Sequence, residues 1–312
     1  MTTDLLPALT AHVTATAHAG PRACRCTTAT LAVREDATVV RHAGTVAKAH
    51  APDADPAELA LRLTVATRLT GILLPPLAPA PAELHGRLVT HWPYGIPVDP
   101  DDPDAAPWEA AATLLARLHR TPAPVAVPPM RGPAKAALAL ARLRAAAPRH
   151  PAATPVLRAW AALPPWARGE APVPDTVTLC HGDFHLGQLL RHPASDGPWL
   201  LIDVDDLGTG APAWDLARPA AWYACGLLAP DAWHRFLAAY RAAGGPAVPP
   251  DGDVWAALDV PARALTAQTA ARAVTKAVAA DRSLDEVERS LVDACARMSP
   301  SARPRAGRSS AQ

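Results

Sequence analysis

The feature that most constrains the fold is a change in sequence character near residue 92. Before it, short alternating runs of strand-forming residues are separated by tight turns, and the first three predict a β-meander. These runs occupy residues 28–34, 37–41, 45–50, 72–74 and 86–91. The segment 92–107 is rich in proline and aspartate and is interpreted as a hinge.

Helical patterns dominate the rest of the chain. One helix is also expected before the hinge, because Asp55, Pro56 and Glu58 suit the N-cap, first and third helical positions. After the hinge, helices are expected at 108–119, 134–147 and 154–163 and from about 213, 231, 254 and 283, with short β runs at 176–180, 188–191 and 199–203. We predict an α+β, bilobal fold: a small β-rich N-lobe (1–92) with one main helix, a larger, mainly helical C-lobe (93–297) and a disordered tail (298–312).

Composition excludes several classes of protein. The formal net charge of the 312 residues is +1, without the basic stripe of a nucleic-acid-binding protein. No stretch reaches the roughly 18 apolar residues of a membrane helix, and the N-terminus lacks a signal-peptide pattern. We therefore expect a cytoplasmic protein with no nucleic-acid or membrane partner.

The five cysteines are expected to be reduced thiols. They are scattered and odd in number, and Cys24 and Cys26 are too close together for an ordinary disulfide. No second Cys/His pair is evident at the usual zinc-ligand spacing. Reduced thiols also fit the cytoplasm.

The most informative segment is 179–217. One predicted strand ends just before a loop containing Asp183, and another ends at Asp203, with Asp205 close behind. Acidic residues directly after an apolar strand are unfavourable in a core unless they are paired or metal-bound. If the two loops lie side by side, their carboxylates repel one another, and a divalent cation relieves that repulsion.

This pattern suits phosphoryl transfer, which needs a carboxylate at the attacking hydroxyl, oxygen ligands for magnesium and a cation over the phosphates. Asp183 suits the first role, with a structural turn aspartate as the alternative, just as Asp203 could instead cap its loop. The side-chain oxygens of Gln188, Asp203 and Asp205 suit the second. Lys48, one of three lysines in the chain and central in a predicted strand, suits the third, although a strand lysine can also simply face water.

The strings HGDFHLGQLL, LIDVDD and APAWDLA resemble the signature of aminoglycoside phosphotransferases and their choline-kinase relatives, which are similar to protein kinases. The family pattern is H-G-D-x-H-x-x-N, then I-D-x, then D-L-A near a helix start. The matching residues are His181, Gly182, Asp183, His185, Ile202, Asp203, Asp215, Leu216 and Ala217. TVAKAH and GRLVTHWPYG resemble the family's phosphate-binding strand and interlobe hinge, so the resemblance covers about residues 28–280.

This resemblance implies a protein-kinase-like fold and a kinase that uses ATP or GTP with Mg²⁺ to phosphorylate the hydroxyl of a small molecule. It makes Asp183 the catalytic base, Gln188 and Asp203 magnesium ligands, and Lys48 the phosphate contact. Hinge contacts to the nucleotide would come from His91, Trp92 and Tyr94.

Four residues are assigned supporting roles: His181, His185, Glu58 and Asp215. His181 is expected to hold its loop through backbone hydrogen bonds, and His185 either supports that loop or faces the site. Glu58 either belongs to the helix cap or pairs with Lys48. Asp215 lies in a helix first turn, where a carboxylate is favoured, so its role is either structural or part of the site.

The sequence departs from the family pattern in three ways. The glutamate expected to pair with Lys48 from the following helix is not obvious, and Glu58 is the nearest candidate. Gln188 stands where asparagine is usual, and it is one methylene longer at a position where magnesium tolerates little slack. The turn at residues 35–36 lacks a glycine-rich loop, so Lys48 and the metal would carry more of the phosphate binding.

The acceptor is left open between an aminoglycoside, another antibiotic, an amino alcohol and a sugar. Candidate acceptor-site residues are Trp222, Tyr223 and Trp255, with core packing as the alternative for each. An acidic surface that would suit a cationic substrate could come from Asp206, Asp251, Asp253 and Asp259.

Two other functions are kept as alternatives. The string His181-x-Asp183-x-His185 could bind zinc in a metal-dependent hydrolase. A nucleotide-binding relative without catalysis is the other, because Gln188 is unusual and the glycine-rich loop is missing.

Overall fold

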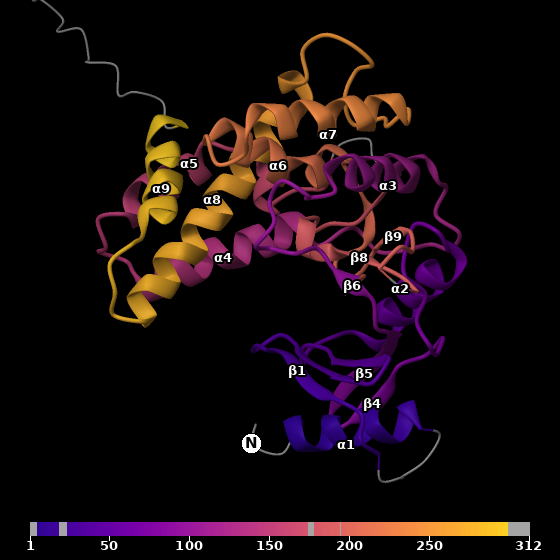
Figure 1. Cartoon of the computed structure of the whole chain (residues 1–312). Helices are drawn as coiled ribbons and strands as arrows, with labels where there is room; N and C mark the ends of the chain where they lie inside the picture. Colours follow the sequence, from indigo (N-terminus) through magenta and orange to yellow (C-terminus); the bar gives the residue numbers. More distant parts are fainter. Residues whose placement is uncertain (1–4, 19–23, 174–177, 194, 299–312) are drawn as a thin grey trace, which may run out of the picture. The chain divides into compact units, whose positions relative to one another are not determined.

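The computed structural model describes residues 5–18, 24–173, 178–193 and 195–298 (Figure 1). The predicted tail therefore lies outside the described residues from position 299 on. The chain divides into two compact units, which are described separately. The first comprises Met1–Gly132, Asp175–Leu216 and Pro230–Val254, and the second comprises Pro133–Pro174, Ala217–Ala229 and Trp255–Gln312.

The first unit contains a five-stranded antiparallel sheet in the order β1-β2-β3-β5-β4. Its strands are β1 (Thr28–Val33), β2 (Thr38–His42), β3 (Thr45–Ala49), β4 (Ala82–Leu84) and β5 (Arg87–Pro93). The predicted meander agrees with β1 to β3, and the short strand β4 was not predicted. In the register of β3 with β5, Lys48 lies opposite Thr90.

Helix α1 (Leu5–Ala17) packs against this sheet and was not among the predicted elements (Figure 1). Its side chains Leu9 and Val13 are fully buried in one cluster with Val40 and Ala47. Successive side chains of a strand point to opposite faces. Lys48 therefore lies on the face of the sheet that α1 does not cover.

Helix α2 (Pro56–Arg68) begins where the sequence predicts. The side chain of Asp55 accepts hydrogen bonds from the backbone N–H groups of Ala57 and Glu58, which satisfies two of the unpaired donors of the first turn. The strand predicted at 72–74 is absent. Instead, Leu73 forms isolated bridges with Thr70 and Leu201 after a turn.

The rest of the first unit consists of helices and two small sheets. Helices α3 (Trp108–Arg120) and α7 (Pro230–Ala242) pack together, with the rings of Trp108 and Phe236 edge to face at 5.9 Å. Strand β7 (Thr178–Cys180) pairs with β10 (Gly208–Gly210). A three-stranded sheet joins β6 (Ile96–Pro97), β8 (Leu189–Arg191) and β9 (Trp199–Leu201), and the turn η2 (Leu186–Gln188) precedes β8.

The second unit is helical. It contains nearly all of α4 (Gly132–Ala146), α5 (Ala153–Ala161), η1 (Pro165–Arg168), α8 (Trp255–Ala279), α9 (Glu286–Met298) and most of α6 (Ala213–Ala224). Across the residues that the structure describes, no helix combines the length and apolar character needed to span a bilayer.

Candidate active site

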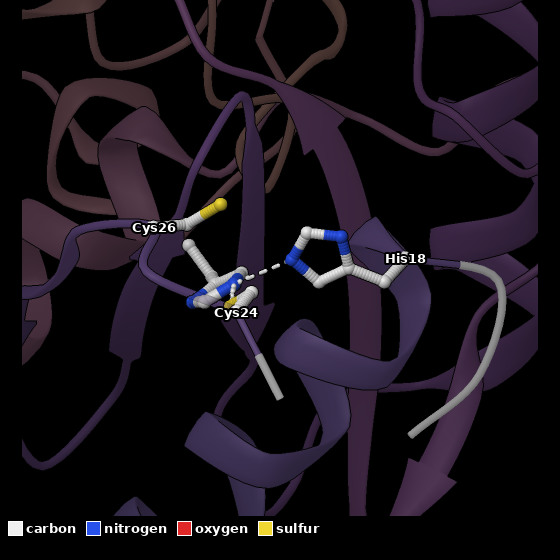
Figure 2. A group of neighbouring side chains, drawn as sticks. His18, Cys24 and Cys26 are labelled. Carbon is white, nitrogen blue, oxygen red and sulfur yellow. Dashed lines mark hydrogen bonds between the residues drawn. The ribbon is translucent and has the colours of Figure 1, made fainter. Parts of the chain in front are cut away.

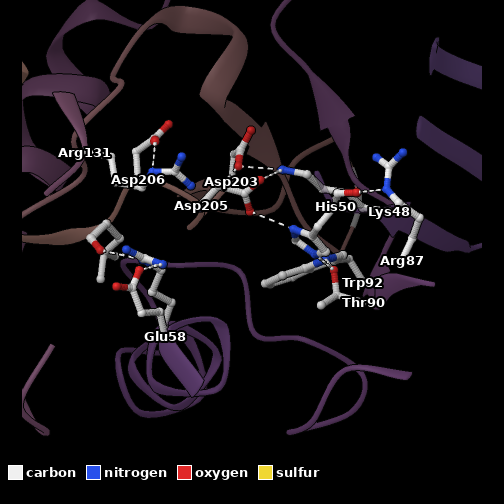
Figure 3. Close-up of polar contacts among 12 residues, drawn as sticks. Lys48, His50, Glu58, Arg87, Thr90, Trp92, Arg131, Asp203, Asp205 and Asp206 are labelled. Atoms are coloured by element: carbon white, nitrogen blue, oxygen red, sulfur yellow. Dashed lines mark hydrogen bonds and ion pairs between the residues drawn. The ribbon is translucent and has the colours of Figure 1, made fainter. Parts of the chain in front are cut away.

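Lys48 lies between two carboxylates that follow strand β9. Its Nζ is 2.7 Å from Asp203 Oδ1 and 2.9 Å from Asp205 Oδ2 (Figure 3). The Lys48 side chain is 13 % exposed, so this cation is largely shielded from water. The side chains of the two aspartates are about a quarter to a third exposed to solvent. The strand lysine and the acidic loop that the sequence singled out are thus in direct contact.

The charges in this cluster stabilise one another. Burial alone would lower the pKa of Lys48, but the neighbouring carboxylates of Asp203 and Asp205 outweigh it and raise that pKa. Burial would likewise raise the pKa of Asp205, but Lys48 and a hydrogen bond from His50 outweigh it and lower that pKa. At neutral pH the lysine is therefore a cation and Asp205 an anion.

His50 is a member of this cluster that sequence reasoning missed. It follows Lys48 by two positions, and its Nδ1 lies 3.0 Å from Asp205 Oδ1 (Figure 3). Its Nε2 is 2.8 Å from the hydroxyl of Thr90 on the adjacent strand β5. The signal was present in the string TVAKAH, because residues two apart in a strand share a face.

The backbone at Asp203 is unusual. Asp203 has a φ of +65°, a left-handed conformation that only glycine adopts without cost, although aspartate tolerates it better than most residues. The carboxylate of Asp203 has a second partner besides Lys48, because its Oδ2 lies 3.4 Å from the side-chain amide nitrogen of Gln188. Gln188 is 7 % exposed. Two of the three predicted metal ligands, Gln188 and Asp203, therefore adjoin each other.

The two loops converge at their backbones. The ring nitrogen Nε2 of His181 donates to the carbonyl of Ile202 at 2.8 Å. Gly182 has a φ of +87°, and a Cβ added there would lie 2.3 Å from the carbonyl oxygen of Asp206. Only glycine meets both conditions, since any side chain would push the loops apart.

Asp183 follows directly after this point of contact and is half-buried. His185 lies at the other end of the loop, where its Nδ1 accepts a hydrogen bond from the backbone N–H of Gly187. Of the two roles considered for His185, this contact corresponds to loop support. The roles of Asp183 and His185 in chemistry remain predictions.

Asp215 holds the same loop from behind. It is 1 % exposed, and its carboxylate accepts backbone N–H groups from His181 at 2.6 Å and from Gly182 at 2.8 Å. A third bond, at 2.9 Å, comes from His119 Nε2 on helix α3. Asp215 was considered either as a structural residue or as part of the site. These contacts fit the structural role.

A buried chain of hydrogen bonds continues from Asp215 to helix α7, and sequence reasoning missed it. The hydroxyl of Tyr240 accepts from the backbone N–H of Ala247 and lies 2.7 Å from His119 Nδ1. Burial raises the pKa of Tyr240, so the hydroxyl keeps its proton and donates it to His119. This assigns the remaining ring proton of His119 to Nε2, facing Asp215.

Glu58 does not pair with Lys48 in this structure. Its carboxylate lies 3.0 Å from Arg62, one helical turn along α2. Arg62 is 4 % exposed, and its Nε donates to the carbonyl of Leu207, beyond the acidic loop. Of the two roles considered for Glu58, the pair with Lys48 is not formed here, because Arg62 holds the glutamate while Asp203 and Asp205 hold the lysine.

Arg62 could have been noticed in the sequence. It lies in the apolar stripe that contains Leu59, Leu63 and Ala66, where a charged residue is out of place unless it has a buried partner.

The predicted hinge residues have other contacts. His91 lies on the face of the sheet that α1 covers, where its ring is 5.0 Å from the ring of His12. Burial and the proximity of His12 lower the pKa of His91. The side chain of His91 therefore lies on the face of the sheet away from Lys48. Only the backbone of His91 could contact a nucleotide on the Lys48 side, and its carbonyl already accepts a hydrogen bond from the N–H of Leu77.

Trp92 is on the Lys48 side of the sheet, with its indole N–H donated to Thr90 (Figure 3). The ring of Tyr94 lies beneath the guanidinium of Arg41 at 3.4 Å, and its backbone N–H donates to the carbonyl of Gly44. Nucleotide binding by these residues stays a prediction.

Asp206 is buried. Its side chain is 8 % exposed and lies 3.9 Å from Arg131, and a part for it in an acidic substrate surface stays a prediction. The three predicted aromatic residues belong to the second unit. There the rings of Tyr223 and Trp255 stack at 6.4 Å, and Trp222 is half-buried on α6. Their role in acceptor binding stays a prediction.

The H-x-D-x-H string does not form a zinc site. His181 is fully buried and uses Nε2 on a backbone carbonyl, while His185 uses Nδ1 on a backbone amide. Within the described ranges, the groups of converging His, Cys, Asp and Glu ligand atoms lie elsewhere: His119–Cys180–Asp215, and a cluster near α1. In the first of these groups, the carboxylate of Asp215 already accepts hydrogen bonds from three N–H donors.

Comparison with known proteins gives a family. The model of the phosphotransferase enzyme family APH matches residues 29–259. No curated protein sequence matches the chain. The match confirms the resemblance that the motifs predicted.

Several solved structures share the fold. Aminoglycoside phosphotransferase APH(3'')-Id from Streptomyces rimosus is 21 % identical, covering 85 % of this chain and 98 % of its own, with a TM-score of 0.54. A choline/ethanolamine kinase family protein from Mesorhizobium loti is 16 % identical, covering 87 % and 86 %, with a TM-score of 0.54. A thermostable mutant of aminoglycoside phosphotransferase APH(4)-Ia, in ternary complex with AMP-PNP and hygromycin B, is 13 % identical, covering 93 % and 98 %, with a TM-score of 0.59. The predicted α+β, protein-kinase-like fold is confirmed.

Proposed function

We propose that this chain, which belongs to the phosphotransferase enzyme family, is a small-molecule kinase that transfers the γ-phosphate of ATP to a substrate hydroxyl. One observation carries the proposal: Lys48 Nζ contacts Asp203 and Asp205 at 2.7 and 2.9 Å. The loop that carries these two aspartates contacts the loop of Asp183 through His181 and Gly182. A largely buried cation, a half-buried carboxylate pair and a further carboxylate are the parts that phosphoryl transfer requires.

Lys48 would hold the phosphates of the nucleotide. An ammonium group has three N–H donors, and Asp203 and Asp205 engage two of them. The third is available to a phosphate oxygen, and the two carboxylates fix the direction in which it points. Because the carboxylates keep the lysine protonated, its charge is present at any physiological pH.

Asp183 would orient the acceptor hydroxyl and take its proton as the oxygen attacks phosphorus. The loop that carries it is fixed from behind by Asp215 and from the side by His181, so the carboxylate starts from a held backbone. Holding a reacting group in position removes an entropic cost from the barrier.

The donor atoms beside Lys48 fit magnesium. Asp203 supplies carboxylate oxygens and Gln188 supplies an amide 3.4 Å away, and hard oxygen ligands of this kind suit Mg²⁺. Gln188 presents its amide nitrogen to Asp203 here, so its carbonyl oxygen would face an ion only after the amide turned over. A bound Mg²⁺ would neutralise charge on the transferred phosphoryl group. Asp205 is held by Lys48 and His50, which favours a role in fixing the lysine.

The acceptor is proposed as a small molecule with a hydroxyl group. Fold neighbours include a choline/ethanolamine kinase family protein, a macrolide 2'-phosphotransferase and aminoglycoside phosphotransferases, so these acceptor classes define a test panel. The shared fold does not choose among them.

The test is a nucleotide-consumption screen with Mg²⁺ across aminoglycosides, macrolides, amino alcohols and sugars, with product detected by mass. We expect one acceptor class to gain the mass of a phosphoryl group. Asp183→Ala should lower that turnover by about 10²- to 10⁴-fold while leaving nucleotide affinity nearly unchanged.

The control is Asp196→Asn, which removes a carboxylate from an exposed turn of the same unit. Nucleotide binding without turnover for any acceptor would favour the alternative of a non-catalytic relative. Full activity in Asp183→Ala would refute the assignment of the base.

A further inference from the structure

A second cluster of reactive side chains lies near the end of α1, on the side of the sheet away from Lys48. It consists of His18, Cys24, Cys26 and His42, which we call the Cys/His cluster (Figure 2). One ligand atom from each of the four lies within 4.8 Å of every other. The proposed phosphotransfer chemistry uses none of these residues.

We propose that the Cys/His cluster is a zinc site that fastens helix α1 to the sheet. Two thiolates and two imidazoles are the ligand set of a structural, four-coordinate zinc site. Because Zn–N is about 2.0 Å and Zn–S about 2.3 Å, the ligand atoms of such a site lie about 3.3–3.8 Å apart. Here His18 Nε2 is 3.0 Å and Cys24 Sγ is 3.3 Å from His42 Nε2. The cluster is therefore already near the size that zinc requires.

Hydrogen bonding alone does not explain the arrangement. A ring nitrogen offers one bonding position, either a lone pair or a proton. His42 Nε2 has two close neighbours, His18 Nε2 and Cys24 Sγ, and it can satisfy only one of them as a directed hydrogen bond. A cation at the centre would bind all of these atoms together.

The second nitrogen of His42 is also arranged for a metal. Its Nδ1 lies 2.7 Å from the hydroxyl of Thr28, its partner across β1 and β2. When Nδ1 carries the proton and donates it to Thr28, the lone pair is on Nε2, inside the cluster. An outer hydrogen bond that fixes the tautomer is typical of histidine ligands to zinc.

The position of the cluster indicates what the ion would do. His42 is buried at the end of β2, whereas Cys24 and Cys26 are exposed, so an ion can enter from solvent. His18 directly follows the last residue of α1, where the helix dipole favours a positive charge. A helix of 13 residues is marginal by itself, and a metal would add a strong contact at its C-terminal end.

Sequence spacing concealed this site. Cys24 and Cys26 have no second pair at the usual zinc spacing, and the histidines come from separate elements that only the β1–β2 pairing and α1 bring together. Binding is written Zn²⁺ + 2 R–SH → Zn(SR)₂ + 2 H⁺, with both imidazoles neutral. Two protons go to solvent, and no oxidant is needed.

The experiment uses the full chain without a polyhistidine tag, reduced, loaded with Zn²⁺ and freed of excess metal by gel filtration. We expect one zinc per chain by mass spectrometry. Cys24→Ser/Cys26→Ser should retain less than about one tenth of it, because both thiolate ligands are lost. These two side chains are exposed, so the variant should fold.

Two controls locate the metal. Cys225→Ser removes a cysteine of the second unit and should keep one zinc, and Asp203→Asn should also keep it. Co²⁺ should give the visible absorption of a tetrahedral ion and a thiolate charge-transfer band in the wild type and in both control variants, and in Cys24→Ser/Cys26→Ser neither should appear. Chelation of the zinc should lower Tm by about 3–5 °C, for an ion initially present at about 100 times its Kd.

Several results would overturn the proposal. The reduced wild-type chain could fail to bind zinc, Cys24→Ser/Cys26→Ser could retain it, or Asp203→Asn could lose it. The site could bind Cu⁺ in preference to Zn²⁺. The protein as isolated could contain a Cys24–Cys26 disulfide. An unchanged Tm after complete loss of zinc would refute the fastening role. None of these outcomes depends on phosphotransfer activity.

Discussion

Two aspartates in the first unit, Asp203 and Asp215, contact the two ends of the segment 181–188 in opposite ways. Asp215 is 1 % exposed and accepts three N–H donors at 2.6 to 2.9 Å. Asp203 has a side chain 34 % exposed, and its nearest partner is the cation of Lys48. The contact from Gln188 to its second oxygen is long, at 3.4 Å.

This difference separates a carboxylate that supports a loop from one that can bind a ligand. A carboxylate whose acceptor positions are filled by backbone N–H groups has little capacity left for a metal. One that faces solvent, with a long contact on one oxygen and a left-handed backbone, retains that capacity at some local cost. Substitutions at the two sites should therefore separate activity from stability.

Asp203→Asn should give the largest effect, on rate. We expect a fall of about 10²- to 10³-fold in kcat, because the proposed Mg²⁺ loses a carboxylate ligand and would neutralise the charge on the transferred phosphoryl group less well. Tm should move by no more than about 2 °C, since part-exposed ion pairs contribute about 0–1 kcal/mol and Lys48 keeps Asp205. Steady-state kinetics across Mg²⁺ concentrations and a thermal melt measure both, with Asp196→Asn as control. A large loss of Tm with kcat intact would reverse the comparison.

Asp215→Asn should reduce stability. The amide keeps one acceptor oxygen but turns an NH₂ toward backbone N–H donors, so the free energy of unfolding should fall by about 2–4 kcal/mol. Urea unfolding followed by circular dichroism measures this. Asp231→Asn is the matched control, because that carboxylate belongs to the same unit and is 86 % exposed. Equal midpoints for Asp215→Asn and the wild type would show that the buried network carries no stability.

Tyr240→Phe should sharpen the comparison with a smaller effect. It leaves the ring in place but removes the hydroxyl that links Ala247 to His119, so we expect a loss of about 1–2 kcal/mol in unfolding free energy. The nucleotide KM should stay unchanged, because the network lies behind the loop. Tyr94→Phe, which keeps its ring beneath Arg41, serves as the stability control. The change in nucleotide KM can be converted to a free energy as RT ln of the KM ratio. A value larger than the loss of unfolding free energy would place Tyr240 in the site itself.

Glu58→Gln should have the smallest effect. An ion pair one helical turn apart contributes about 0.3–0.5 kcal/mol, and Arg62 keeps its bond to Leu207. The KM for nucleotide should remain within about twofold, which corresponds to about 0.4 kcal/mol. A tenfold increase would instead indicate that Glu58 pairs with Lys48 when nucleotide is bound, as the family resemblance allowed.

Much of the molecule was accessible from local sequence patterns. The meander β1 to β3, the Asp55 cap of α2 and the two acidic loops after β7 and β9 follow from alternation, capping and strand ends. These features depend on residues a few positions apart. Helix α1 was missed because its Ala- and Thr-rich surface gives a weak periodic pattern, and its burial depends on a sheet that follows it in the chain.

By itself, the sequence determined which reactive side chains are present and next to which strands they stand: Lys48 in one strand, Asp183 in the loop after another, and Asp203 at the end of a third. Only the tertiary structure decided the partners. Lys48 meets Asp203 across 155 positions, His119 meets Tyr240 across 121, and His18 meets His42 across 24. Such contacts depend on how sheets and helices pack, and side-chain periodicity carries no record of which distant element will face a residue.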